Sequence, residues 1–301
     1  MNQDFKFFLL AITATFFWGF SDVFFKKSTD PHDPYSHYKI LISIGFFMGI
    51  QAFFELYRLY GSGGTYSLHT IWIYIPISFL YILSMGVDFY GYRFLRISIG
   101  SPIASTSGVA AGFLSWLVLG NDMSPLQFIA IVTIGTGLIL LAYFEYRDQQ
   151  EGTLGKNEIV KLGATALIFP VTYMIVDAIA TFLDEHYMTS IMTETEALIS
   201  FELTFLFVGL LAFIYIFFVK KHRYQPWKPS LIMGGICETA GQFFYVFALA
   251  GDGVVTAPIM SLDGIVASIF GVLVLKENIR TKQKLTILMI GIAVFVLGFF
   301  E

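Results

Sequence analysis

Residues 101–119 read SPIASTSGVAAGFLSWLVL, and residues 257–275 read APIMSLDGIVASIFGVLVL. At a shift of 156 positions, which carries Pro102 onto Pro258, the two stretches agree at several small residues and in a closing Leu-Val-Leu. The other matched pairs are Ile103 with Ile259, Ser105 with Ser261, Gly108 with Gly264, Ala111 with Ala267, Gln127 with Gln283 and Gly135 with Gly291. A chain of 301 residues that repeats at about half its length is the product of a duplication.

The composition of the chain is that of a membrane protein. Hydrophobic residues make up 56% and charged residues 13%, and the mean hydropathy is +0.72. Soluble domains carry about 25% charged residues, and a helix that spans a bilayer needs about 20 apolar residues. We therefore predict an all-α integral membrane protein with ten transmembrane helices. The predicted segments are 5–25, 38–58, 71–93, 99–119, 125–145, 158–181, 197–219, 230–249, 254–275 and 282–300.

The basic residues predict how the two halves are oriented. Of 18 Lys and Arg residues, only Lys6 and Arg58 fall on one face of the predicted bundle. Basic loops mark the cytoplasmic side, so both termini are predicted outside the cytoplasm of a cell membrane. Because five helices is an odd number, the halves 1–150 and 151–301 must cross the bilayer in opposite senses. Such inverted five-helix repeats are typical of secondary transporters, in which the halves rock about a central site.

The sequence offers no sign of several other kinds of site. Cys237 is the single cysteine, so no disulfide can form within the chain. No GxxxxGK[ST] loop for ATP occurs, and no basic run suggests a nucleic-acid partner. The histidines are all expected in loops, without the spacing of metal ligands: His32, His37, His69, His186 and His222. We therefore predict no cofactor and no metal, and the partners expected are a small solute and the lipid bilayer.

Two features of the halves resemble a known family. The first predicted helix carries Phe16-Phe17-Trp18-Gly19, and each repeated block runs from a proline through Leu-Val-Leu to a turn, which is Lys276-Glu277-Asn278 in the second half. These features are similar to the EamA-type repeats of the drug/metabolite transporter superfamily. The resemblance implies a ten-helix carrier with a central cavity, whose cargo the fold does not define.

Acidic residues within the apolar segments are candidates for the binding site, because a charge inside the bilayer costs about 2.5–3.5 kcal/mol. Glu238 lies near the middle of the eighth segment, and Gln242 and Tyr245 follow it on the same helical stripe. Asp263 lies in the repeated block, where the other half has Ser107. A packing requirement shared by both repeats does not explain this acid. The open alternative for Glu238 and Asp263 is a protonated carboxyl that bonds a neighbouring helix.

Two further acids allow a structural interpretation. Asp22 precedes Lys26 by four residues, so an ion pair explains it as well as a binding site does. Asp88 lies near Arg93 and Arg96 in the sequence, and an ion pair with one of them is the favoured interpretation.

The remaining candidates combine an acid with aromatic rings. Asp177 lies in the last third of the sixth segment, whereas Glu202 lies about one turn inside the seventh and is expected to reach the headgroups. Trp18, Tyr92 and Tyr173 lie within helices near the acids. Aromatic rings together with carboxylates are a usual way to hold an organic ammonium group.

The sequence therefore predicts a secondary active transporter of a small cationic or zwitterionic amine, which moves by alternating access and is exchanged for or moved with protons. Glu238 and Asp263 would bind the cation or the proton. The alternatives are an exporter of amino acids or other neutral or aromatic metabolites, and a membrane assembly partner that transports nothing. A channel or a membrane-embedded enzyme is disfavoured, because the polar residues differ between the halves and no catalytic constellation is visible.

Overall fold

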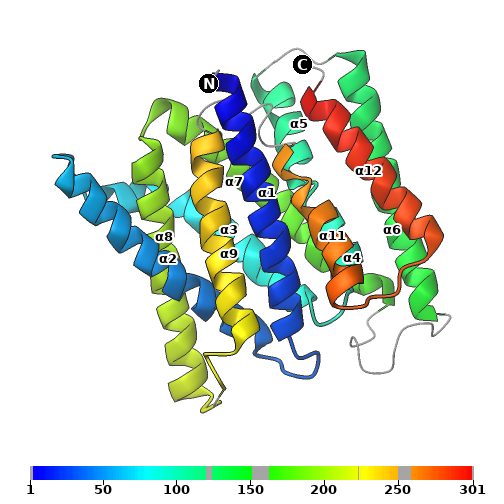
Figure 1. Cartoon of the computed structure of the whole chain (residues 1–301), viewed down its shortest axis with the longest axis horizontal. Helices are drawn as coiled ribbons and strands as arrows, with labels where there is room; N and C mark the ends of the chain where they lie inside the picture. The colour runs from blue at the N-terminus through cyan, green and yellow to red at the C-terminus, as the bar shows by residue number, and fades with distance from the viewer. Residues whose placement is uncertain (1–2, 120–123, 151–162, 223, 250–258, 300–301) are drawn as a thin grey trace.

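The computed structural model describes residues 3–119, 124–150, 163–222, 224–249 and 259–299, and every regular element in these ranges is helical (Figure 1). The first half contains α1 (Gln3–Ser28), α2 (Ser36–Gly61), α3 (His69–Gly91), α4 (Ile97–Ala104), α5 (Ser107–Leu119) and α6 (Pro125–Gln150). The second half contains η1 (Gly163–Leu167), α7 (Ile168–Ser190), α8 (Glu194–Ile214), η2 (Tyr215–Val219), α9 (Pro229–Leu249), α11 (Asp263–Val274) and α12 (Thr281–Phe299).

The length and apolarity of these helices suit a bilayer. Within the described ranges, seven helical stretches are long and apolar enough to cross a membrane. Their outer surface carries large apolar side chains, such as Phe53 and Trp72, which are 61% and 72% exposed. The prediction of an all-helical, multi-pass membrane protein is confirmed. The count of ten stays a prediction, because the ninth predicted segment begins in residues 250–258, outside the described part of the chain.

The two halves pack as a symmetric pair. α1 packs against α9. Their repeat counterparts in the other half, α7 and α3, also pack against each other. α2 packs against α8 and α6 against α12, so each of these helices contacts its own repeat counterpart, and α4 packs against α11 across the boundary between the halves. The start of α1 and the end of α12 lie at one edge of the bundle, and α6 runs away from that edge whereas α12 runs toward it (Figure 1). This arrangement is the one expected for inverted repeats. The boundary at 150/151 stays a prediction, because residues 151–162 are not described.

The fourth predicted helix, 99–119, is broken, and the prediction of one continuous helix there is wrong. α4 ends at Ala104 and α5 begins at Ser107, with a turn at residues 105–106. The second half has a turn at 261–262, which is the same place after the shift of 156. Thr106 Oγ1 donates to Ile103 O at 2.8 Å, so a side chain competes for a helix carbonyl at the break.

The sixth predicted helix is displaced along the chain. The sequence predicted a helix over 158–181, whereas η1 ends at Leu167 and α7 extends to Ser190. The polar residues Asp184, Glu185 and His186 therefore lie inside a helix. The prediction that every histidine lies in a loop is wrong for His186, and also for His37 and His69, which lie in the first turns of α2 and α3.

α2 and α8 lie in close contact at Gly45 and Gly209, and the space there leaves no room for a side chain. A Cβ atom on Gly45 would lie 2.7 Å from Phe205 O and 3.0 Å from Gly209 Cα, both of which are backbone atoms. We expect Gly45→Ala to lower the free energy of unfolding by about 1–3 kcal/mol, because the helices must move apart. The measurement is the melting temperature in detergent. Gly61→Ala, in the same helix with nothing within 4 Å, is the control. Equal melting temperatures for the two variants would contradict this packing.

A buried ionic cluster joins the halves at the edge of the bundle where α6 ends and α12 begins (Figure 1). Asp148, at the end of α6, lies 3.0 Å from Arg96 and 2.7 Å from Arg280, and Gln283 Nε2 donates to it at 3.1 Å. The side chains of Arg96 and Asp148 are only 2% and 3% exposed. The cluster therefore links the start of α4, the end of α6 and the start of α12.

Glu277, from the turn before α12, stabilises the start of α4 across the boundary between the halves. Its carboxylate accepts hydrogen bonds from the backbone N–H groups of Ile97 and Ser98 at 3.0 and 2.9 Å. An acid at this position satisfies two N–H groups that have no partner within their own helix, and it lies at the positive end of the helix dipole. The acidic turn that the sequence shares with EamA-type repeats has a structural use in this chain.

Candidate functional site

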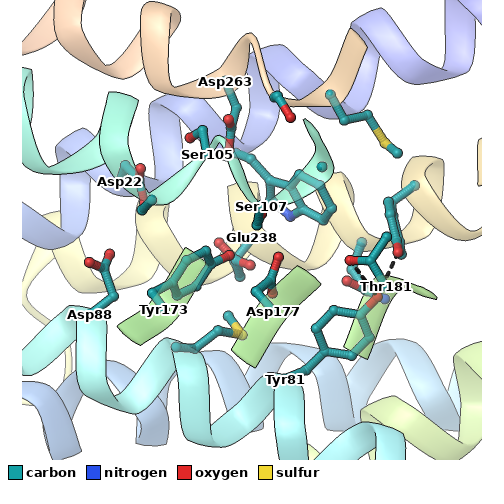
Figure 2. Close-up of a pocket in the computed structure, with 18 of the residues that line it drawn as sticks. Asp22, Tyr81, Asp88, Ser105, Ser107, Tyr173, Asp177, Thr181, Glu238 and Asp263 are labelled. Atoms are coloured by element: carbon teal, nitrogen blue, oxygen red, sulfur yellow. Dashed lines mark hydrogen bonds between the residues drawn. The ribbon is translucent and has the colours of Figure 1, made fainter. Parts of the chain in front are cut away.

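A cavity of about 80 Å³ lies between the halves and is lined almost equally by both (Figure 2). α1, α3 and the broken α4–α5 segment form one side, and α7, α9 and the start of α11 form most of the other. The two breaks at 105–106 and 261–262 both reach it, because Ser105 and Ser261 line the cavity. The duplicated blocks that define the repeat thus meet at this cavity.

Five carboxylates face this cavity, each from a different helix. Asp22 comes from α1, Asp88 from α3, Asp177 from α7, Glu238 from α9 and Asp263 from α11. Figure 2 shows all five turned toward one space. The described residues that line the cavity include no lysine, arginine or histidine. Like charges repel strongly where water is scarce, so a cation or protons would stabilise this group.

Hydroxyl groups orient the carboxylates on the side of α1. Tyr92 Oη and Ser101 Oγ donate to the two oxygens of Asp22 at 2.6 and 2.5 Å. Ser21 Oγ donates to Glu238, which ties α1 to α9. Neutral donors hold a carboxylate in place and leave its charge available to a ligand.

The carboxylates from α7 and α11 have hydrogen-bond donors of their own. Ser84 Oγ lies 3.5 Å from Asp177 Oδ1, and the backbone N–H of Gly264 donates to Asp263 at 2.6 Å. Gly264 also allows the two repeated blocks to approach, because a Cβ atom there would lie 2.8 Å from Pro102 Cα.

One wall of the cavity is aromatic and carries free donors. The Trp18 and Tyr245 rings pack with centroids 5.0 Å apart, and Tyr173 also lines the cavity. Trp18 Nε1 and Gln242 Nε2 are buried and have no hydrogen-bond partner in the described part of the chain. Buried donors without a partner are costly, and these two N–H groups lack an acceptor in this conformation.

The structure brings together nine of the ten residues proposed from the sequence. The residues that line the cavity are Trp18, Asp22, Asp88, Tyr173, Asp177, Glu238, Gln242, Tyr245 and Asp263. Tyr92 is not among the lining residues but donates to Asp22. The proximity of these residues is an observation, whereas their role in binding stays a prediction.

Two structural interpretations from the sequence are wrong. Asp88 does not pair with Arg93 or Arg96, since Arg93 Nε donates to Pro31 O at 2.9 Å and Arg96 contacts Asp148. Asp88 lines the cavity. Glu202 does not reach the headgroups, because its side chain is fully buried.

Asp184, Tyr81 and Thr181 were not identified from the sequence. Tyr81 and Thr181 line the cavity, and Asp184 lies directly behind them. Asp177, Thr181 and Asp184 follow one another at i, i+4 and i+7 on α7, which is one stripe of a helix. This spacing could have identified Asp184, but the predicted helix ended at residue 181.

Comparison with known proteins identifies the class of protein. The model of the EamA-like transporter family matches residues 6–143 and residues 165–299, one match in each half. The chain therefore belongs to the EamA-like transporter family, and it is a transporter in a membrane. The family that the sequence resembled is confirmed, and so is the repeat within the chain.

Individual relatives are more distant. Two provisionally named sugar uptake proteins, from Streptococcus agalactiae serotypes V and III, are each 22% identical over 232 residues, which cover 76% of this chain and 77% of the relative. A solved crystal structure has the same fold, with a TM-score of 0.63, 12% identity and coverage of 97% of this chain and 98% of the other.

Proposed function

We propose that this transporter moves a small cationic or zwitterionic amine, coupled to protons, by alternating access at the cavity between the halves. The observation that carries the proposal is the set of five carboxylates around one cavity, with no basic residue among the described lining residues. A carboxylate beside aromatic rings is a common arrangement for binding an ammonium group. Glu238 and Asp263 are proposed as the principal partners of the cation.

The two free donors favour a solute that also carries an acceptor. Trp18 Nε1 and Gln242 Nε2 can donate to a carboxylate or a hydroxyl group of the bound molecule. An amino acid or a hydroxylated amine would satisfy the acids and these donors together. A simple anion would meet five carboxylates and is disfavoured.

The size of the cavity supports a cycle with more than one conformation. Ligand pockets are typically about 300–1,000 Å³, whereas this cavity measures about 80 Å³. The solute therefore enters only when the halves move apart. Because the two halves pack as a symmetric pair, opening toward either face requires similar motions.

A sugar is the second candidate. The two relatives from Streptococcus agalactiae are provisionally named for sugar uptake. Acidic side chains, Gln242 and the rings of Trp18 and Tyr245 can also bond and stack on a sugar. The amine is preferred, because a neutral sugar leaves the five acids without an opposite charge.

Uptake into proteoliposomes separates the candidates. The purified chain is tested with choline, lysine, tyramine, glucose, ribose and glutamate, each at two internal pH values and with empty liposomes as the control. We expect uptake of one or more of the amines and a dependence on the pH gradient. Uptake of glucose or ribose alone would replace the amine with the sugar, and uptake of glutamate alone would contradict both.

A further inference from the structure

A second polar cluster lies immediately behind the wall of the cavity. Asp184 on α7 is fully buried, and three tyrosines from two other helices surround it. Tyr74 Oη donates to Asp184 Oδ1 at 2.5 Å, whereas Tyr81 Oη and Tyr245 Oη lie 3.3 and 3.4 Å from Asp184 Oδ2. One carboxylate thus connects α3, α7 and α9, which belong to both halves.

This cluster shares two tyrosines with the lining of the cavity, whereas its carboxylate lies behind that lining. Tyr81, Tyr245 and Thr181 face the cavity, whereas Asp184 and Tyr74 do not. Tyr81 Oη also lies 3.2 Å from Thr181 Oγ1 (Figure 2). The hydroxyl groups of Tyr81 and Tyr245 therefore have the cavity on one side and Asp184 on the other.

The number of available protons allows only certain hydrogen-bond patterns. Tyr81 Oη and Tyr245 Oη are 2.7 Å apart, so one of them must donate to the other. Each phenol has one proton, and only the phenol that accepts within the pair keeps its proton for Asp184 or for Thr181. A protonated Asp184 would donate to one of the two phenols. Its protonation therefore changes the direction in which the Tyr81 and Tyr245 hydroxyl groups point.

We propose that Asp184 holds the coupling proton of the transport cycle, separate from the five cavity acids that bind the cargo. Tyr81 and Tyr245 would transmit its protonation to the cavity through the direction of their hydroxyl groups. The inference rests on the proposed function, which couples the transport of an amine to protons. It assigns the proton to Asp184 and leaves the amine to the acids that line the cavity. The proton binds to a carboxylate oxygen and leaves from the same oxygen, so no other bond is made or broken.

The surroundings of Asp184 suit a site that exchanges its proton only in an open conformation. The titratable groups that face it are Tyr74 and Tyr81 from α3, Tyr245 from α9 and Asp177 on its own helix. No lysine or arginine is among the described groups in contact with it. Asp184 and Tyr74 are both fully buried in this conformation, so water reaches the carboxylate only when helices separate.

The first test needs no solute. Infrared titration of the protein in liposomes follows the protonated carboxyl band in the wild type, Asp184→Asn and Tyr74→Phe. We expect a band that is lost in Asp184→Asn and that titrates at a shifted pH in Tyr74→Phe, because Tyr74 is a donor to the charged carboxylate. A titrating band that Asp184→Asn leaves unchanged would overturn the assignment.

The second test separates coupling from cargo binding, with choline as the probe and the membrane potential clamped at zero. A gradient of one pH unit, about 1.4 kcal/mol per proton, drives roughly tenfold accumulation in a one-to-one exchange. We expect Asp184→Asn to retain counterflow at equal pH and to lose this accumulation. Loss of both activities, or retention of both, would overturn the inference. Failure of the proposed function would give a different result, because the wild type would then transport none of the solutes in the panel. In that case the infrared titration would still decide whether Asp184 binds a proton.

Discussion

Replacing Glu238 with glutamine is expected to weaken binding of a cationic solute roughly 10- to 150-fold. A hydrogen bond to a charged partner contributes about 1.5–3 kcal/mol, and glutamine keeps the shape of the side chain while it removes the charge. Glu238 lines the cavity and accepts from Ser21 on α1. The measurement is the apparent affinity for the amine that the wild type transports, obtained from uptake over a range of concentrations.

The matched control for this variant is Glu202→Gln. Glu202 is also a buried glutamate in a membrane-spanning helix, but it is not among the described residues that line the cavity. We expect this control to retain the affinity of the wild type. Equal affinities in Glu238→Gln and the wild type would remove Glu238 from the binding site, and equal losses in both variants would indicate a general effect of buried acids.

Arg96→Met is expected to lower the free energy of unfolding by about 3 kcal/mol, at the low end of the usual cost of removing one partner from a buried ion pair. The substitution leaves the buried Asp148 with Gln283 and with Arg280, whose side chain is 42% exposed. It also removes the bond from Arg96 to Asn278 O, which joins the halves. The measurement is unfolding in detergent.

A double variant tests whether the loss comes from the uncompensated charge. Asp148→Asn removes that charge, so we expect Arg96→Met with Asp148→Asn to be more stable than the sum of the single effects predicts. Additive losses would show that Arg96 contributes through packing alone. Unchanged stability of Arg96→Met would contradict the description of this cluster as a link between the halves.

The repeat and the membrane class could be predicted from the sequence, because both depend on local apolar composition and on a regular spacing. The shift of 156 carries the start of α5 at Ser107 onto the start of α11 at Asp263. The breaks at 105–106 and 261–262 were not predicted. A break depends on how serine and threonine side chains bond the backbone, and apolar periodicity carries no information about that.

Most of the candidate site could also be predicted, because a charge within an apolar helix is rare and needs a reason. Glu238 and Asp263 were identified in this way, and both line the cavity. The sequence could not assign partners. Arg93 and Arg96 follow Asp88 closely along the chain, yet they contact Pro31 and Asp148. Proximity in sequence is a weak guide to ion pairs where the chain turns at the end of a helix.

Asp184 was missed for a different reason. The predicted end of the sixth helix at residue 181 placed this acid in a loop, where a charge needs no explanation. The apolar run is interrupted by Asp184, Glu185 and His186, but the helix continues to Ser190. Tyr74, Tyr81 and Tyr245 satisfy the carboxylate from other helices. Such long-range partners are invisible in a pattern read along one segment.

The central claim is that one cavity between the halves opens to each side of the membrane in turn. The most direct test uses Ser107→Cys, which places a thiol on the cavity wall, in a chain whose single native cysteine is removed by Cys237→Ser. A thiol reagent that cannot cross the membrane is applied to right-side-out and to inside-out vesicles. The account predicts labelling from both sides, with the transported solute slowing both reactions. Labelling from one side only, or from neither, would contradict it.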